Sequence, residues 1–169
     1  MLSIKEFQHC TQSGRKSYMS LEKITWKIYA FEDLTPHLLY EILKLRQEIF
    51  IIEQECIYPD IDGADQNCYH LCGFLDESLA ALLRVVPPGL NREEPALGRI
   101  SVREKFRGKG AGKMLIRKGI ETARQQFGDR PIRIEAQTYL DSFYKSLGFH
   151  PVGEPYDLDG IEHIQMVLS

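Results

Sequence analysis

The sequence predicts a single α+β domain in which strands and amphipathic helices share one core. Its 169 residues, 43% of them apolar, are enough for one domain with a sizeable core. Several short segments alternate apolar and polar residues as half-buried strands do, and others repeat apolar residues at helical spacing. Turn residues such as Asp76-Glu77 and Asp159-Gly160 separate strand-like segments and indicate antiparallel hairpins.

The first third of the chain combines an extension, a strand and a helix. Residues 1–22 show no sustained periodicity and are predicted to be a loosely held N-terminal extension, with Met19 as an alternative start, so that the domain spans 23–169. A strand is predicted at 24–31. A helix then begins at Thr35-Pro36, a capping residue followed by proline at the first helical position.

The rest of the chain alternates strands and helices. Further strands are predicted at residues 68–75, 78–86, 97–102, 132–137, 150–156 and 161–168. Helices are predicted at 113–127 and 139–147, each ended by a glycine, Gly128 and Gly148. A carboxylate-rich loop at 53–65 separates the first helix from the next strand.

A glycine-rich turn joins the strand at 97–102 to the helix at 113–127. Gly108, Gly110 and Gly112 let the backbone turn its N–H groups toward one point, and the helix adds the positive end of its dipole. Arg107 and Lys113 flank the turn with cations. The turn lacks the spacing and hydroxyl of a nucleotide-hydrolase P-loop and the third glycine of a dinucleotide fingerprint. The turn is therefore predicted to bind a di-anion without belonging to either of these two motifs.

Two motifs carry a resemblance to a known family. The Arg-x-x-Gly-x-Gly turn resembles the pyrophosphate loop of the GCN5-related N-acetyltransferases (GNAT), and Tyr144 with Gly148-Phe149 is similar to their late Tyr-x-x-x-Gly-Phe signature. The order of predicted elements matches that superfamily over roughly residues 24–168. More narrowly, a set of residues resembles the ElaA-like branch: Leu45, Arg46, Phe50, Glu53, Gln54, Tyr58, Asp60, Ile61, Asp62, Gly63, His70, Asp159, Gly160, Ile161, His163 and Ile164.

The resemblance implies a central mixed, mostly antiparallel sheet flanked by helices, and an acetyl-CoA-dependent N-acetyltransferase that needs no metal. The acceptor would be a primary amine that attacks the thioester directly. A backbone N–H near Val102 would face the thioester carbonyl, and Tyr144 would protonate the departing thiolate. The implied acetyl-CoA-binding residues form one run: Ile100, Ser101, Val102, Arg107, Gly108, Lys109, Gly110, Ala111, Gly112 and Lys113.

The base and the acceptor site stay open at this point. His70, His163, Glu53 and Glu135 are candidate bases, and Arg99 stands where the superfamily often places a carboxylate. The candidate acceptor-binding residues are Glu53, Asp62, Glu135 and His163. Together with Asp60 and Asp65, the carboxylates suggest a negative mouth for a small or cationic amine, whereas the alternative for the acidic loop is a solvated turn.

Composition excludes several classes of protein. A net charge of -3 gives no global basic field for nucleic acid or an anionic membrane, and no apolar run is long enough for a membrane span or a secretion signal. We therefore expect a cytoplasmic protein whose four cysteines are free thiols. Cys68, His70 and Cys72 share one strand face but span too far to bind one zinc ion.

Two other functions and two oligomeric states are compatible with the sequence. The same fold could serve a non-catalytic acyl-CoA-binding regulator, and the same turn could serve a nucleotide-binding protein. Tyr144 favours catalysis over both. Monomer and homodimer are left undecided.

Overall fold

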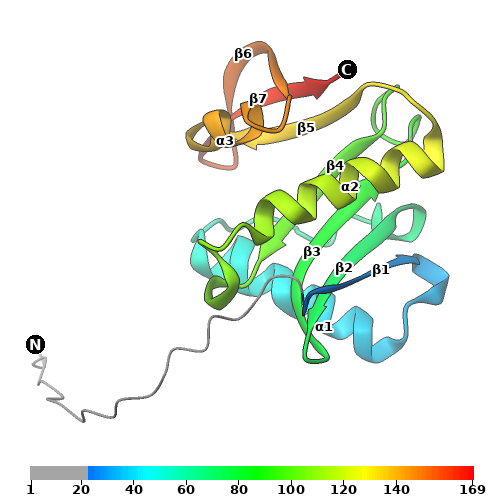
Figure 1. Ribbon diagram of the computed structural model, residues 1–169. Helices are drawn as coiled ribbons and strands as arrows, with labels where there is room; N and C mark the ends of the chain where they lie inside the picture. The colour runs from blue at the N-terminus through cyan, green and yellow to red at the C-terminus, as the bar shows by residue number, and fades with distance from the viewer. Residues whose placement is uncertain (1–22) are drawn as a thin grey trace, which may run out of the picture.

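Residues 23–169 are described by a computed structural model, and the predicted extension 1–22, with Met19, lies outside them (Figure 1). Within residues 23–169, seven strands form one sheet in the order β1-β2-β3-β4-β5-β7-β6. Their bounds are Thr25–Ala30 (β1), Tyr69–Leu75 (β2), Ser78–Val86 (β3), Ala96–Val102 (β4), Ile132–Gln137 (β5), His150–Leu158 (β6) and Ile161–Leu168 (β7). Only β4 and β5 are parallel neighbours, so the mixed, mostly antiparallel sheet is confirmed.

In the described part of the chain, three α-helices accompany the sheet. They are α1 (Pro36–Arg46), α2 (Ala111–Phe127) and α3 (Asp141–Lys145). The predicted cap of α1 is confirmed, because the Thr35 hydroxyl accepts a hydrogen bond of 3.2 Å from the Leu38 N–H. After Arg46 the chain does not enter a loop at once but continues as a π-helical segment, η3 (Gln47–Glu53). Glu53, assigned to the acidic loop from the sequence, therefore ends a helical segment.

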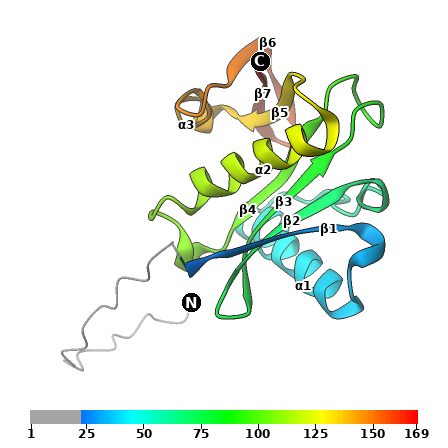
Figure 2. The same cartoon turned by 45° about the vertical axis from the view of Figure 1, so that its right-hand side comes forward.

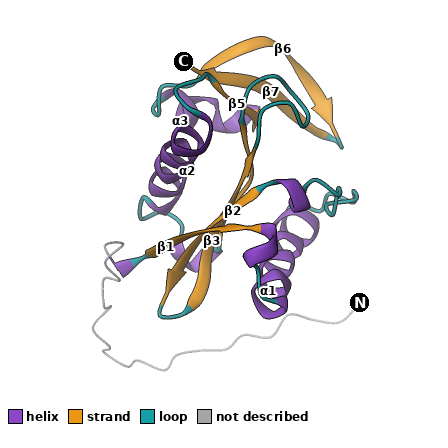
Figure 3. Cartoon of the chain, turned by 90° about the vertical axis from the view of Figure 1, so that its right-hand side faces the viewer, coloured by secondary structure: helices purple, strands orange, loops and turns teal. Residues whose placement is uncertain are grey.

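The helices cover both faces of the first half of the sheet. Helix α2 packs against β2, β3 and β4, and α1 lies on the opposite face of β3 and β4 (Figures 1 and 3). Strand β3 is apolar along most of its length for this reason. Leu83 and Val85 join the core around α2, whereas Leu79 and Leu82 join the core around α1.

The second half of the sheet has one covered face. Ile132, Ile134 and Ala136 of β5 and Met166 of β7 are buried in the core that α2 and α3 share. The alternate residues of β5, Arg133, Glu135 and Gln137, belong to the other face. That polar face lies on the side of the sheet that carries α1 (Figure 3).

The predictions about membrane-spanning segments and cysteines can also be compared with the structure. No helix among residues 23–169 has the length and apolar character needed to cross a bilayer. Cys56, Cys68 and Cys72 carry free thiols, and Cys10 lies outside the described residues.

Candidate active site

A split in the sheet lies between β4 and β5. The two parallel strands pair only at Ala96 with Arg133 and at Leu97 with Ile134. Beyond Leu97 the strands diverge, and residues 98–102 keep a backbone edge with no strand partner on that side. Figure 2 shows β5 leading away from the first half of the sheet. Ile100, Ser101 and Val102, the residues expected to pair with the pantetheine arm, all belong to this free edge.

The same part of β4 contains a β-bulge. Arg84 pairs with Gly98 and Leu82 pairs with Ser101, so Arg99 and Ile100 together stand opposite Leu83 alone. Arg99 has a backbone φ of +50°, a conformation that residues other than glycine rarely adopt. A bulge reorients backbone N–H groups that a regular strand would pair, so this one can present a donor toward the split.

The glycine-rich turn forms the start of helix α2. Gly110 is the N-cap residue, with a φ of +90°, and no side chain caps the helix. The first helical backbone bond runs from the Met114 N–H to the Gly110 carbonyl, at 3.1 Å. The N–H groups of residues 111–113 therefore have no partner within the helix, which leaves three donors available at its positive end.

Arg107 connects this turn to η3. Its Nε donates to the Val102 carbonyl at 2.7 Å, and its Nη1 and Nη2 donate to the two Glu53 carboxylate oxygens at 2.6 and 2.9 Å. These hydrogen bonds lower the pKa of Glu53. Lys109 and Lys113 are exposed beside the same turn. The cationic side chains expected around a pyrophosphate are thus present, with one of them already engaged by a carboxylate.

Tyr144 lies on α3, which packs beside the start of α2. The Tyr144 side chain is 5% exposed and makes edge-on contacts with Phe143 and Phe149, at centroid distances of 5.2 and 6.0 Å. Burial raises the pKa of Tyr144 to about 12, so the hydroxyl stays protonated at neutral pH. The ring of Phe143 comes within 3.5 Å of the point where a Cβ on Gly112 would lie. This environment suits both roles considered for Tyr144, a proton donor and a packing aromatic.

The polar face of β5, β7 and β6 gathers uncharged hydrogen-bonding groups next to the split. Gln137 pairs with His163 across β5 and β7, and His163 pairs with Tyr156 across β7 and β6. The Nδ1 of His163 lies 2.7 Å from the Ile161 carbonyl oxygen. That oxygen can only accept, so Nδ1 carries a proton, and in the neutral form of the ring the lone pair is on Nε2. Gln54, at the end of η3, accepts a hydrogen bond of 3.4 Å from Gln137 and closes this face on one side.

His70 lies elsewhere, inside the sheet. Its side chain is 1% exposed, and its Nε2 lies 3.2 Å from the Asp65 carbonyl oxygen. Burial lowers its pKa. A base must reach the amine it deprotonates, and this geometry instead gives His70 a structural contact with the acidic loop. Among residues 23–169, no group of acidic, histidine or cysteine side chains gathers to hold a metal ion.

The carboxylates of the suggested negative mouth are paired with arginines. Arg46 binds Asp60 and Asp65 at 2.8 Å, and Arg84 binds Asp62 at 2.7 Å and Asp65 at 3.0 Å. Glu53 is bound by Arg107 and Glu135 by Arg92. The loop is therefore neither a free acidic rim nor a solvated turn, and little negative charge is left to select a cationic acceptor.

The arginines behind this arrangement could have been noticed in the sequence. Arg84 stands inside the apolar run of β3, where a charge must find an opposite charge to be buried. Arg46 occupies the core-facing end of α1. The sequence indicated that such partners were needed, but it did not indicate which of its carboxylates supplied them.

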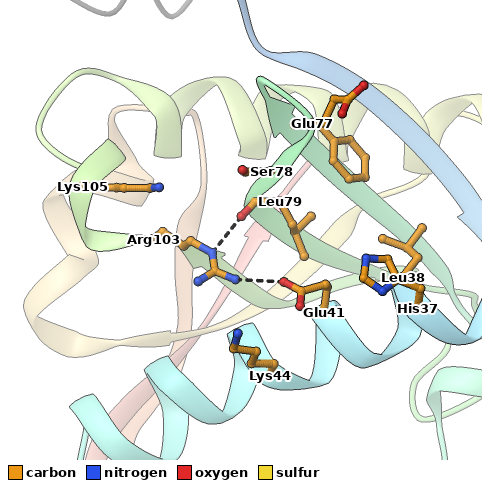
Figure 4. Close-up of a pocket in the computed structure, with 10 residues that line it drawn as sticks. His37, Leu38, Glu41, Lys44, Glu77, Ser78, Leu79, Arg103 and Lys105 are labelled. Atoms are coloured by element: carbon orange, nitrogen blue, oxygen red, sulfur yellow. Dashed lines mark hydrogen bonds and ion pairs between the residues drawn. The ribbon is translucent and has the colours of Figure 1, made fainter.

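A pocket of about 360 Å³ lies on the α1 side of the sheet, between α1 and the start of β3 (Figure 4). Arg103 forms one wall, where it donates to the Leu79 carbonyl at 2.8 Å and pairs with Glu41 at 3.5 Å. The pocket does not include the split edge of β4, Tyr144 or His163. Its lining combines the cations Lys44, Arg103 and Lys105 with the carboxylates Glu41 and Glu77.

Comparisons with known proteins agree with this geometry. Residues 51–169 match the family model of the acetyltransferase (GNAT) domain. Protein ElaA of Escherichia coli is 38% identical over 145 residues, which cover 85% of this chain and 95% of ElaA. The crystal structure of E. coli ElaA matches with a TM-score of 0.81 at 36% identity, covering 86% of this chain and 99% of that one. An acyl-CoA N-acyltransferase from Pseudomonas aeruginosa matches with a TM-score of 0.83 at 34% identity, over 86% and 99% of the two chains.

The chain therefore belongs to the GNAT acetyltransferase family. Within that family it falls in the ElaA-like branch. This membership supports acyl transfer from a CoA thioester as its class of reaction.

Proposed function

We propose that the protein is an N-acetyltransferase that moves the acetyl group of acetyl-CoA to a primary amine. The observation that carries this proposal is the free edge of β4 together with the uncapped start of α2, which follows it after a short turn at residues 103–110. A strand edge can pair with the amide groups of a pantetheine arm, and the helix start can bind its pyrophosphate. When bound, acetyl-CoA supplies a thioester, whose carbonyl carbon is open to attack by an amine.

The chain supplies a donor, an acid and a base for that attack. A backbone N–H at the β4 bulge would stabilise the negative charge that develops on the carbonyl oxygen. Tyr144 would donate its proton to the thiolate as the carbon–sulfur bond breaks. His163 would take the proton that the amine nitrogen loses as the carbon–nitrogen bond forms, because the neutral ring, with its proton on Nδ1, has a lone pair on Nε2. The amine must be neutral to attack, so turnover is expected to rise with pH.

The acceptor would be held mainly by neutral groups. Gln137 and His163 contribute amide and imidazole groups to the polar face, while the Tyr156 hydroxyl is buried and the nearby Glu135 is paired with Arg92. We expect a primary amine to be selected by hydrogen bonds and shape. Polyamines, amino acids, aminoglycosides and lysine peptides, each assayed by release of free CoA thiol, cover cationic and zwitterionic classes. Turnover that falls steeply with added salt would instead support selection by charge.

Thermal unfolding with separate ligands tests the proposal. CoA or acetyl-CoA at a hundred times its dissociation constant stabilises by about 2.7 kcal/mol, which raises the midpoint by roughly 5–10 °C. ATP with magnesium and NAD should produce no comparable shift. A shift with either of these and none with CoA compounds would overturn the proposal.

A pair of glycine variants localises the binding site. Gly110→Val places a branched side chain at the anion cradle and should abolish the shift with CoA. Gly128→Val is the matched control, because Gly128 has a similar φ of +81° but lies at the other end of α2. The control should lose stability and keep its response to CoA. Equal CoA affinity in both variants would show that the turn is not the cradle.

Tyr144→Phe separates an enzyme from a binding protein. If Tyr144 is the acid, this change should leave acetyl-CoA affinity and stability nearly unchanged and lower kcat by about 10²–10⁴. If Tyr144 only packs, turnover should stay near that of the wild type. A protein that binds acetyl-CoA but turns over none of the acceptors above would support the non-catalytic alternative.

A further inference from the structure

The acidic loop is attached to the β4 bulge by an arginine whose partners are themselves fixed. Arg99 Nε lies 2.7 Å from Asp60 Oδ1, and its Nη2 donates to Asp62 Oδ2 and to the Asp60 carbonyl, each at 3.1 Å. The guanidinium also lies over the ring of Tyr58, 5.7 Å from its centroid. Arg99 is thus held by two charges, one carbonyl and one aromatic face.

Buried arginines hold the aspartates that Arg99 binds. Arg46, 1% exposed, donates to Asp60 Oδ2 at 2.8 Å and to the Asp60 carbonyl at 2.6 Å. Arg84, 4% exposed, binds both oxygens of Asp62 at 2.8 and 2.7 Å. Breaking a buried pair of this kind leaves an uncompensated charge, so the loop is a rigid anchor. The anchor extends from α1 and β3 to the bulge of β4.

The backbone of Arg99 needs such an anchor. Its φ of +50° is unfavourable for a residue with a Cβ, and such conformations persist where the surroundings over-determine them. The Arg99 carbonyl also accepts a hydrogen bond of 3.0 Å from the Ser101 hydroxyl. The strained residue therefore sits at the point of β4 where the direction of the N–H groups changes.

We propose that Arg99 is a positioning residue, which uses the Asp60–Asp62 anchor to hold the β4 bulge so that its backbone N–H stays aimed at the thioester carbonyl. This inference rests on the proposed function. Arg99 does not touch the reacting atoms. The superfamily often places a carboxylate in this region of the strand. Here the strand carries Arg99 instead, a cation that acts on the backbone geometry of the strand.

Binding of acetyl-CoA and of CoA to the same variants tests this role without an acceptor. CoA has no thioester carbonyl, so it does not report on the donor at the bulge, whereas acetyl-CoA does. The measured quantity is the ratio of the two dissociation constants by titration calorimetry. Arg99→Gly removes the anchor but permits the positive φ, so any change in this ratio comes from the lost side chain.

We expect Arg99→Gly to weaken acetyl-CoA relative to CoA by about two- to tenfold, the worth of one hydrogen bond. Asp62→Asn, which removes one of the two charges that hold Arg99 without changing β4, should shift the ratio in the same direction. Arg99→Lys keeps the positive charge but lacks the forked guanidinium group, so it should recover part of the lost preference for acetyl-CoA. Arg124→Ala, at an exposed pair with Asp129 on α2, is the control and should leave the ratio unchanged.

The outcomes separate the inference from the proposed function. A wild-type protein that binds neither CoA compound would overturn the proposed function. A wild-type protein that binds both, with an unchanged ratio in folded Arg99→Gly and Asp62→Asn, would overturn the positioning role alone. Lower stability without a change in ratio would assign Arg99 a purely structural role.

Discussion

Two arginine–carboxylate groups in this molecule have the same chemistry and opposite surroundings. Arg46 is 1% exposed and binds Asp60 and Asp65 deep between α1 and the sheet, whereas the side chain of Arg107 is 37% exposed where it binds Glu53. Both are multiple, well-aligned contacts. The two groups differ in what happens when the arginine loses its carboxylate partner. Water or a ligand anion can take the place of Glu53 at Arg107, whereas Arg46 is too deeply buried for either to reach it. The buried group therefore stabilises the fold, whereas Arg107 in the exposed group can exchange its carboxylate partner for another anion.

The largest expected difference between the two groups is in stability. Arg46→Ala leaves buried carboxylates without a partner and should lower the free energy of unfolding by about 3–5 kcal/mol. Arg107→Ala breaks an exposed pair and should lower it by less than about 1 kcal/mol. Chemical denaturation of both variants at pH 7 measures this difference. Similar losses would mean that burial does not distinguish the two groups.

Acid should act on two aspartates of the acidic loop: Asp65, which belongs to the buried group, and Asp62, whose side chain is 31% exposed and bound by Arg84. Burial alone would raise their pKa values, but hydrogen bonds and charge from Arg84 and Arg46 outweigh it, so both pKa values lie below the ordinary range. The unfolded chain therefore takes up protons first as the pH falls, and the stabilisation present at neutral pH is lost below about pH 4.

Asp62→Asn should isolate this contribution. The variant should be less stable than the wild type by about 1–2 kcal/mol at pH 7, and the gap should narrow as the pH falls below about 4. Denaturation curves of both proteins between these pH values provide the measurement. A gap that is constant with pH would show that the loss comes from packing and not from the charge.

The exposed group should respond to ligand instead. Glu53 occupies the two terminal nitrogens of Arg107, so Glu53→Gln removes a competitor of the pyrophosphate and should raise CoA affinity by about two- to fivefold, in line with the worth of a surface pair. Arg107→Gln should lower CoA affinity. Calorimetric titration with CoA checks both signs. A weaker affinity in Glu53→Gln would show that Glu53 orients Arg107 for the ligand rather than competing with it.

Salt should produce the smallest effect and the sharpest contrast. The coupling energy between Glu53 and Arg107, measured by a double-mutant cycle, should be about 0.2–1 kcal/mol at low ionic strength and vanish near 1 M salt. The coupling between Arg46 and Asp65 should persist, because ions do not penetrate the buried group. Loss of both couplings at high salt would indicate that the acidic loop opens to solvent.

Local signals in the sequence were sufficient for most elements. Thr35 caps α1, Gly128 ends α2, and the turns at Asp76-Glu77 and Asp159-Gly160 join the expected strands. These features depend on a few neighbouring residues and their backbone preferences. The glycine turn belongs to the same group, since its positive φ values and uncapped helix start follow from residues 107–113 alone.

The site itself depends on contacts between distant segments. The sequence by itself determined the order of the elements, the glycine-rich turn before α2 and the position of Tyr144 beside Gly148-Phe149. Only the tertiary structure decided that Asp62 binds Arg84, 22 residues away, and that β4 parts from β5 after Leu97. Charges and lone pairs act through space, so their partners are fixed by the folded geometry and not by spacing along the chain.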